Sequence, residues 1–262
     1  MANYAQYQMA SDNWMLGHFV VPASRSHELQ ELLPTFPLKQ WSLSAILSKD
    51  VELDIDRVRS LQDNRQIAIA ALEIPPLPPE EIERVFPLLP AGVDVFFEIP
   101  LNSDLEPYLS VLQKIGASAK IRTGGITAEA FPSATKLSEC ILAFAEARVP
   151  FKATAGLHHP LPNEYRLTYE PDSLSSKMHG FLNVTILASL VHWQKVTPEE
   201  AVAILQESLI DRFLFKADGI EWSDRQLSLA QIEEARQQFF RSFGSCSFQE
   251  PIDDLKHLQL LN

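Results

Sequence analysis

The strongest constraint on this chain is a repeated order of segments, in which a short apolar run, a turn and an amphipathic stretch recur about every 25 to 35 residues. This alternation is typical of βαβ units, in which helices join parallel strands. The apolar runs are rich in Val, Ile, Phe and Ala, as strands buried on both faces are. Eight runs qualify as strands: 17–23, 41–47, 66–75, 93–100, 118–125, 150–156, 211–222 and 242–248.

Eight parallel strands in 262 residues predict an α/β protein with a (β/α)8 TIM-like barrel. We expect one domain over residues 1–262, with residues 1–14 as an N-terminal extension. The alternative is an open doubly wound sheet, which normally has a glycine-rich phosphate turn after its first strand. The segment VVPASRS that follows the first run contains no glycine, which favours the barrel. The run 211–222 fits either a strand or a hairpin.

Two of the predicted strands carry basic residues inside an apolar run. Lys120 and Arg122 lie two residues apart in SAKIRTGG, and Lys152 and Thr154 lie two apart in PFKATAG. Residues two apart share one face of a strand, so each pair projects to the same side. In a barrel, the active site lies at the C-terminal ends of the strands, where these residues fall.

Two acidic residues end the strands that come earlier in the chain. Glu73 closes the run 66–75 and Glu98 closes the run 93–100. A buried lysine is costly alone but tolerable when a carboxylate pairs with it. We therefore expect both acids to pair with Lys120 and Lys152, either in a catalytic site or in structural ion pairs at the rim.

Two adjacent histidines, His158 and His159, follow the lysine strand. Only one of two neighbouring side chains points into a site, and we favour His159 over His158. Both histidines and the two acids are adequate metal ligands, but no HxH, HExxH or DxD spacing occurs, and the nearby cationic residues oppose a cation. We therefore expect no metal and no cofactor.

Other polar residues near the predicted strand ends are candidates for substrate contacts. Gly124 and Gly125 form a turn that could hold a phosphate or carboxylate beside Arg122. In GSCS, the backbone N–H groups after the last strand could bind an anion, with Cys246 as an alternative nucleophile. A loop of about 20 residues follows the lysine strand, and such loops are often lids. The remaining candidates are Ser245, Ser247, His179 and Asn183.

A lysine in an apolar pocket beside a second cationic group becomes a nucleophile. Lys152 and Lys120 have this arrangement, a carboxylate would move protons, and Arg122 would hold a substrate carboxylate or phosphate. The sequence therefore predicts Schiff-base chemistry on a small anionic carbonyl compound, as in a lyase or aldolase. Two alternatives stay open. One is a metal-independent proton-transfer isomerase that uses Lys120, Lys152 and Glu98, and the other is a non-catalytic protein for anion binding or assembly.

PFKATAG resembles the strand that carries the Schiff-base lysine in barrels of the deoxyribose-phosphate aldolase type, where a Lys-Thr-x-Thr-Gly run lies on strand six. AKIRTGGI is similar to the Gly-Gly strand of that family, at another place in the chain order. RTGGITAEAFP, PFKATAGLHHP, MHGFLN and SFGSCSFQEPIDDL resemble a family of unassigned activity found in actinobacteria and cyanobacteria. The aldolase resemblance implies a barrel and lysine chemistry. The second resemblance spans about residues 90 to 262 and implies no activity.

The net charge of the chain limits which classes of partner are expected. The formal net charge is -12, and no cluster of Lys and Arg occurs, so nucleic acid and anionic membranes are not expected as partners. The N-terminus lacks the basic and apolar regions of a signal peptide. Two cysteines do not make a disulfide framework. We expect a soluble cytoplasmic protein that binds a small anionic metabolite, with homo-oligomer formation left open.

Overall fold

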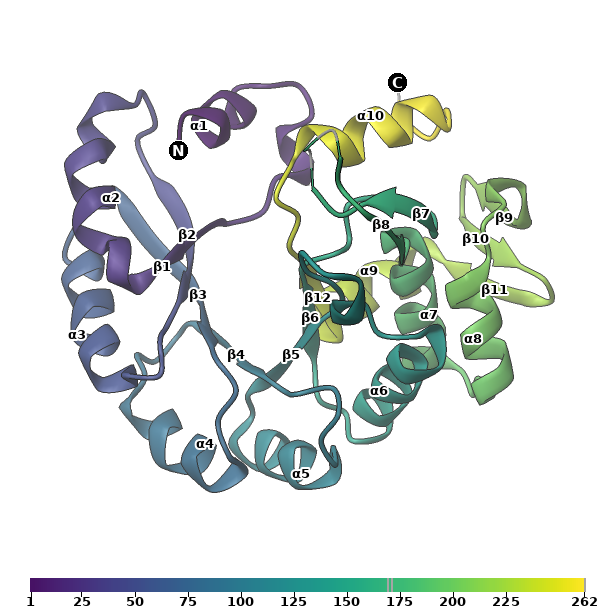
Figure 1. Cartoon of the computed structure of the whole chain (residues 1–262), viewed down its shortest axis with the longest axis horizontal. Coiled ribbons are helices and arrows are strands. Elements are labelled where there is room, and N and C mark those ends of the chain that lie inside the picture. The colour runs from purple at the N-terminus through teal and green to yellow at the C-terminus, as the bar shows by residue number, and fades with distance from the viewer. Residues whose placement is uncertain (169, 171, 262) are drawn as a thin grey trace. The chain divides into compact units, whose positions relative to one another are not determined.

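The computed structural model describes residues 1–168, 170 and 172–261, and it has the mixed α/β architecture that the sequence predicts (Figure 1). Seven parallel strands form one sheet, hydrogen-bonded in the order β1-β2-β3-β4-β5-β6-β12 and flanked by helices. The chain divides into two compact units, residues 1–99 with 110–119 and residues 100–109 with 120–262. The single domain expected over residues 1–262 stays a prediction.

Six of the eight expected runs contain a strand of this sheet, and the last run, 242–248, overlaps β12 (Phe240–Phe243) only at residues 242 and 243. The run 211–222 instead forms an antiparallel hairpin, which joins a third strand in a separate sheet of order β11-β10-β9. Its strands are β9 (Phe213–Lys216), β10 (Gly219–Trp222) and β11 (Arg225–Ser228). Only two residues separate β9 from β10, which is enough for a hairpin but not for a parallel crossover. The α/β class and the parallel sheet are confirmed, and the closed eight-stranded barrel stays a prediction.

The first unit contains the first four strands of the parallel sheet. They are β1 (Phe19–Pro22), β2 (Trp41–Ile46), β3 (Ile67–Ile74) and β4 (Asp94–Glu98). Its α-helices are α1 (Ala2–Gln8), α2 (Ser26–Leu32), α3 (Val51–Gln62) and α4 (Pro79–Val85). Short 3-10 turns extend or precede them: η1 (Asn13–Met15), η2 (Ala23–Arg25), η3 (Leu33–Thr35) and η4 (Phe86–Leu88).

The N-terminal segment belongs to the core of this first unit. The ring of Tyr4 in α1 stacks on Trp41 at a centroid distance of 5.4 Å, and Phe19 meets the same indole edge-on at 5.6 Å. Trp41 is fully buried. The segment expected as an extension, residues 1–14, therefore contributes a helix and a core aromatic ring.

Two elements have residues in both units: α5 (Glu106–Ile115) and β5 (Ser118–Arg122). The second unit continues with η5 (Ala128–Ala130), α6 (Ala134–Glu146), β6 (Phe151–Thr154), β7 (Asn163–Arg166) and β8 (Ser175–Met178). It then has α7 (Phe181–Trp193), α8 (Pro198–Gln206), η6 (Ile210–Arg212), the three-stranded sheet, α9 (Leu229–Gln238), β12 (Phe240–Phe243) and α10 (Gln249–His257).

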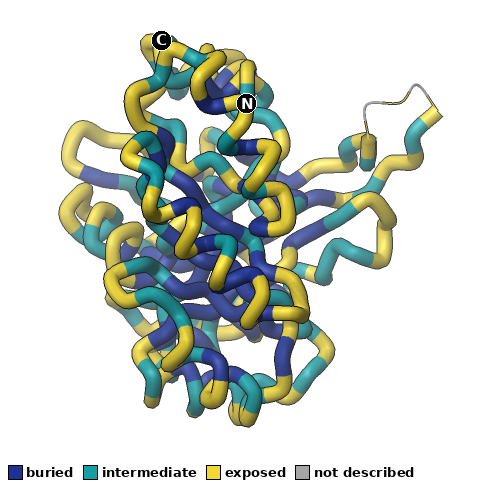
Figure 2. Tube along the Cα trace, turned by 90° about the vertical axis from the view of Figure 1, so that its left-hand side faces the viewer, coloured by how far each residue is buried: buried dark blue, intermediate teal, exposed yellow. Residues whose placement is uncertain are grey.

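Strands β2 to β6 are largely buried, and buried segments are dark blue in Figure 2. In the second unit this core is aromatic. Phe151 of β6 contacts Phe144 of α6 at a ring distance of 5.3 Å and Phe239 at 5.1 Å. These contacts hold Phe151 on the face of the sheet that packs against the helices, so the residues that alternate with it, such as Lys152, face the opposite side.

Candidate functional site

The two predicted lysines lie on neighbouring strands of the sheet, β5 and β6. The N–H of Thr123 donates to the carbonyl of Thr154 at 2.9 Å, which in a parallel pair places Thr123 opposite Ala155. Counting three residues back along both strands places Lys120 opposite Lys152. Neighbouring strands lie about 4.8 Å apart, so the two lysines start from adjacent backbone positions.

Both lysine side chains are buried, with 3% of Lys120 and 5% of Lys152 exposed. Side chains alternate along a strand, so Lys152 projects to the face of the sheet opposite Phe151. Because Phe151 packs against α6 and Phe239, Lys152 points away from that helical layer. Arg122, two residues after Lys120, is exposed at the end of β5.

The two predicted acids lie in the first unit. Glu73 on β3 is 2% exposed and accepts a hydrogen bond from the Ser44 hydroxyl at 2.7 Å. Glu98 is the last residue of β4 and is half-buried. Pairing of these acids with the lysines stays a prediction.

The glycines after β5 allow two loops to approach each other closely. Gly156 has φ +78°, and a methyl group placed there would lie 2.7 Å from the Thr123 carbonyl oxygen and 2.8 Å from Gly124 Cα. A methyl group on Gly124 would lie 2.7 Å from Gly156 Cα. The Thr123 hydroxyl also donates to the Ala155 carbonyl. Gly124 is therefore needed for packing, while Gly125 borders a pocket.

A pocket of about 340 Å³ lies within the second unit, beyond the carboxyl ends of β5, β6 and β12. We call it the histidine pocket. The β7–β8 hairpin contributes one wall, and α10 lies on the same side of β6 and β12 as that hairpin (Figure 1). Its lining residues are Gly125, Phe131, His158, His159, Tyr165, Arg166, Leu167, Thr168, Met178, Cys246 and Glu250.

His159 is held by three neighbours in this pocket. Its Nδ1 lies 2.7 Å from Asp254 Oδ2, and because a carboxylate only accepts, Nδ1–H must donate. Its ring stacks on Tyr165 at a centroid distance of 3.5 Å. Its Nε2 lies 4.0 Å from Glu250 Oε1, within the pocket. Asp254 thus fixes the tautomer that leaves Nε2 as the proton acceptor.

The same carboxylates act on the phenol of Tyr165. Burial, together with the negative charges of Asp254 and Glu250, raises the pKa of Tyr165 to about 12. The Tyr165 hydroxyl donates to the Leu161 carbonyl at 3.2 Å. The phenol is therefore a neutral wall for the His159 ring at physiological pH.

His158 faces the loop after β12. Its Nδ1 is hydrogen-bonded to Ser245 Oγ at 2.9 Å, and Cys246 Sγ lies 3.7 Å from the same nitrogen. Glu250 Oε2 lies 3.7 Å from it. A serine, a thiol and a carboxylate therefore meet one imidazole nitrogen, an arrangement that holds the ring rather than activating a single nucleophile.

Three predicted contact residues have partners that explain them structurally. The Ser247 hydroxyl accepts from the Glu250 N–H at 3.1 Å and so satisfies the first turn of α10. His179 donates from Nε2 to the Pro132 carbonyl at 2.7 Å, and burial lowers its pKa. Asn183 donates to the carbonyls of Ile204 and Glu207 at the end of α8. Neither His179 nor Asn183 borders the histidine pocket.

Sequence reasoning missed Tyr165, Glu250 and Asp254. Glu250 and Asp254 are four residues apart on α10, so they share one helix face. That spacing in QEPIDDL is the signal in the sequence that could have identified them. Tyr165 lies in a segment that we took for a loop and that the structure forms into the β7–β8 hairpin.

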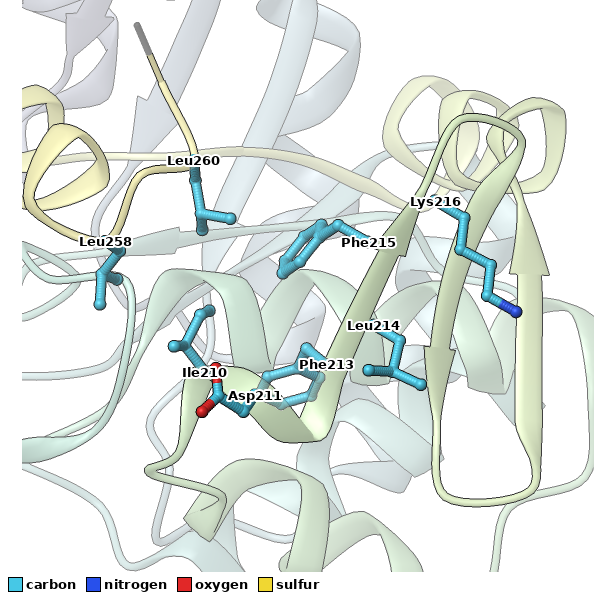
Figure 3. Close-up of a pocket in the computed structure, with 8 residues that line it drawn as sticks. All are labelled: Ile210, Asp211, Phe213, Leu214, Phe215, Lys216, Leu258 and Leu260. Carbon is cyan, nitrogen blue, oxygen red and sulfur yellow. The ribbon is translucent and has the colours of Figure 1, made fainter.

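A second hollow, of about 470 Å³, lies beside β9 and is mostly apolar. Figure 3 shows Leu258 and Leu260 of the C-terminal segment on one side and Ile210, Phe213 and Phe215 on the other. Lys216 points away from this space (Figure 3). The hollow has no histidine or cysteine, and it carries none of the predicted site residues.

No protein-family model, curated protein or solved structure matches this chain. Among residues 1–168, 170 and 172–261, no group of three or more His, Cys, Asp or Glu side chains is arranged to hold a metal ion. Within the same described residues, no helix has the length and apolar character that crossing a bilayer requires.

Proposed function

We propose that the protein is an aldolase-type lyase that forms a Schiff base between Lys152 and a small anionic carbonyl compound. The supporting observation is the lysine pair, in which two buried amines start from opposite positions on neighbouring strands. Like charges directly opposite each other destabilise a sheet. A desolvated lysine beside another cationic group is also the arrangement that makes an amine nucleophilic.

In the proposed reaction, the uncharged amine of Lys152 attacks the carbonyl carbon. With one proton taken up from solvent, the carbonyl oxygen leaves as water, and the C=N bond of a protonated imine replaces the C=O bond. A carbon–carbon bond at the neighbouring carbon then breaks: its electron pair forms the C=C bond of an enamine, the C=N pair moves to nitrogen, and the other fragment leaves as an aldehyde after its hydroxyl loses a proton. The enamine takes a proton at carbon, and water hydrolyses the imine to release the second product and free Lys152. Arg122 binds the substrate carboxylate or phosphate.

The test is reduction with borohydride in the presence of pyruvate or dihydroxyacetone phosphate, followed by measurement of the intact protein mass. The wild-type protein gains one reduced adduct, and Lys152→Met gains none. Arg148→Met is a matched control that removes an exposed cationic side chain just before β6 and keeps the adduct. No adduct on the wild-type protein with either compound would refute the proposal.

A proton-transfer isomerase without a covalent intermediate is the second candidate. The same two buried lysines favour it, because Lys120, Lys152 and Glu98 could move a proton without a covalent bond to the substrate. This candidate predicts hydrogen exchange on a carbonyl compound without any adduct, and loss of the exchange in Glu98→Gln.

The same proposal includes the barrel architecture, the class of substrate and the cellular compartment. The parallel strands form a TIM-like barrel, the substrate is a small anionic metabolite, and the protein acts in the cytoplasm. The parallel sheet supports the barrel, and the exposed Arg122 at the end of β5 supports an anionic substrate.

A further inference from the structure

The histidine pocket contains a catalytic arrangement that the lysine proposal does not use. His159 is hydrogen-bonded through Nδ1 to Asp254, it stacks on Tyr165, and its Nε2 faces the pocket. Only 13% of the His159 side chain is exposed. The ring is therefore fixed in orientation and in tautomer while its basic nitrogen stays inside the cavity.

The distance from His159 Nε2 to Glu250 Oε1 is 4.0 Å, which is too long for a direct hydrogen bond. The space between these two acceptors lies within a cavity of about 340 Å³. Phe131, Leu167 and Met178 contribute apolar walls to this cavity, and Arg166 and Thr168 contribute polar ones. A small substrate can therefore bring a C–H or O–H bond to Nε2.

From this geometry we propose that His159 is the general base and acid of the histidine pocket, that Asp254 is its positioning residue, and that the substrate is a carbon acid. A carbon acid here is a small carbonyl compound with a proton on the carbon next to the C=O group. The inference goes beyond the lysine proposal and does not depend on it, because neither Lys152 nor Lys120 is among the residues that line the histidine pocket, and His159 acts there on the free carbonyl compound.

In the proton step, His159 Nε2 takes the proton from that carbon. The electron pair of the C–H bond forms a C=C bond, and the C=O pair moves to oxygen, which gives an enolate. The imidazolium exchanges its proton with solvent and then returns a proton to carbon, which restores the C=O bond. Nothing is oxidised or reduced.

The test follows exchange of the methyl protons of pyruvate, and of the protons next to the carbonyl of dihydroxyacetone phosphate, by NMR in D₂O. We expect wild-type exchange above the buffer rate, and about 100-fold slower exchange in His159→Gln and Asp254→Asn, as for loss of a general base. Asp254→Glu restores part of the rate. Asp253→Asn, on the same helix but exposed and bonded to Gln249, keeps the wild-type rate.

Rescue by the conservative variant separates positioning from a merely structural role. Asp254→Glu keeps a carboxylate that can accept from Nδ1–H of His159, so it recovers part of the exchange rate that Asp254→Asn loses. Circular dichroism and thermal unfolding of each variant confirm that it is folded.

The adduct and the exchange distinguish the two proposals. A wild-type adduct on Lys152 with unchanged exchange in His159→Gln and Asp254→Asn overturns the role of His159 and leaves the lysine proposal standing. Exchange that depends on both residues without an adduct supports His159 and overturns the lysine proposal. If the wild-type protein catalyses no exchange on either compound, the role of His159 is overturned.

Discussion

Replacement of Gly156 by alanine tests how the loops that lead to the histidine pocket are held. Gly156 has φ +78°, in the left-handed region, where an L-residue costs about 1–2 kcal/mol. The new methyl group would also lie 2.7 Å from the Thr123 carbonyl oxygen and 2.8 Å from Gly124 Cα, both backbone atoms. Overpacking of this kind costs about 1–3 kcal/mol. We expect Gly156→Ala to lower the free energy of unfolding by about 2–5 kcal/mol.

Gly92→Ala is the matched control for this substitution. Gly92 has φ +79°, but a methyl group there would meet no atom within 4 Å. It should therefore show the backbone cost alone, about 1–2 kcal/mol. Urea unfolding, followed by circular dichroism, measures both variants against the wild-type protein. If Gly156→Ala costs no more than Gly92→Ala, the close approach of the two loops is not what requires glycine.

Three further predictions concern side chains of the same chain. Asn183→Ala removes the donor to two carbonyls at the end of α8 and should lower the free energy of unfolding by about 2–4 kcal/mol. Its control, Asn163→Ala on the exposed hairpin, should change that free energy by less than about 0.5 kcal/mol. Equal effects of the two variants in urea unfolding would contradict this. A thiol reagent should label the exposed Cys246 in the folded protein. Cys140 is fully buried, with its thiol pKa raised to about 11, so it should react only after unfolding. Rapid labelling of both cysteines in the folded protein would refute the burial of Cys140. Ultraviolet titration should show Tyr165 ionising near pH 12, and Asp254→Asn should lower that midpoint. The folded pKa of Tyr165 lies above its unfolded value near 10. The contribution of Tyr165 to stability is therefore present below pH 10 and is lost as pH rises through about 12.

The strands and the lysines were predictable because both follow from local periodicity. Buried parallel strands appear as continuous apolar runs, and a lysine inside such a run stands out against them. The face that Lys152 shares with Thr154 follows from the period of two. The sequence alone does not show that Lys120 and Lys152 lie opposite each other. Their placement depends on the register between β5 and β6, which follows from the hydrogen bond between Thr123 and Thr154.

The walls of the histidine pocket could not be predicted in the same way. His159 and Asp254 are 95 residues apart, and only the packing of α10 brings them together. The hairpin strands NEYR and SSKM lack the apolar alternation that marks a strand, because they lie largely at the surface. The run 211–222 was ambiguous since its apolar pattern fits a hairpin as well as a buried strand.

The most direct test of the account is the position of the trapped adduct in a tryptic map after reduction with pyruvate. Trypsin does not cleave after an alkylated lysine, so an adduct on Lys152 yields the peptide 149–166 with its mass increase and without cleavage after Lys152. The account predicts this peptide, together with normal cleavage after Lys120. An adduct found only in the peptide 115–122, or scattered over exposed lysines, would contradict the assignment of Lys152 as the nucleophile.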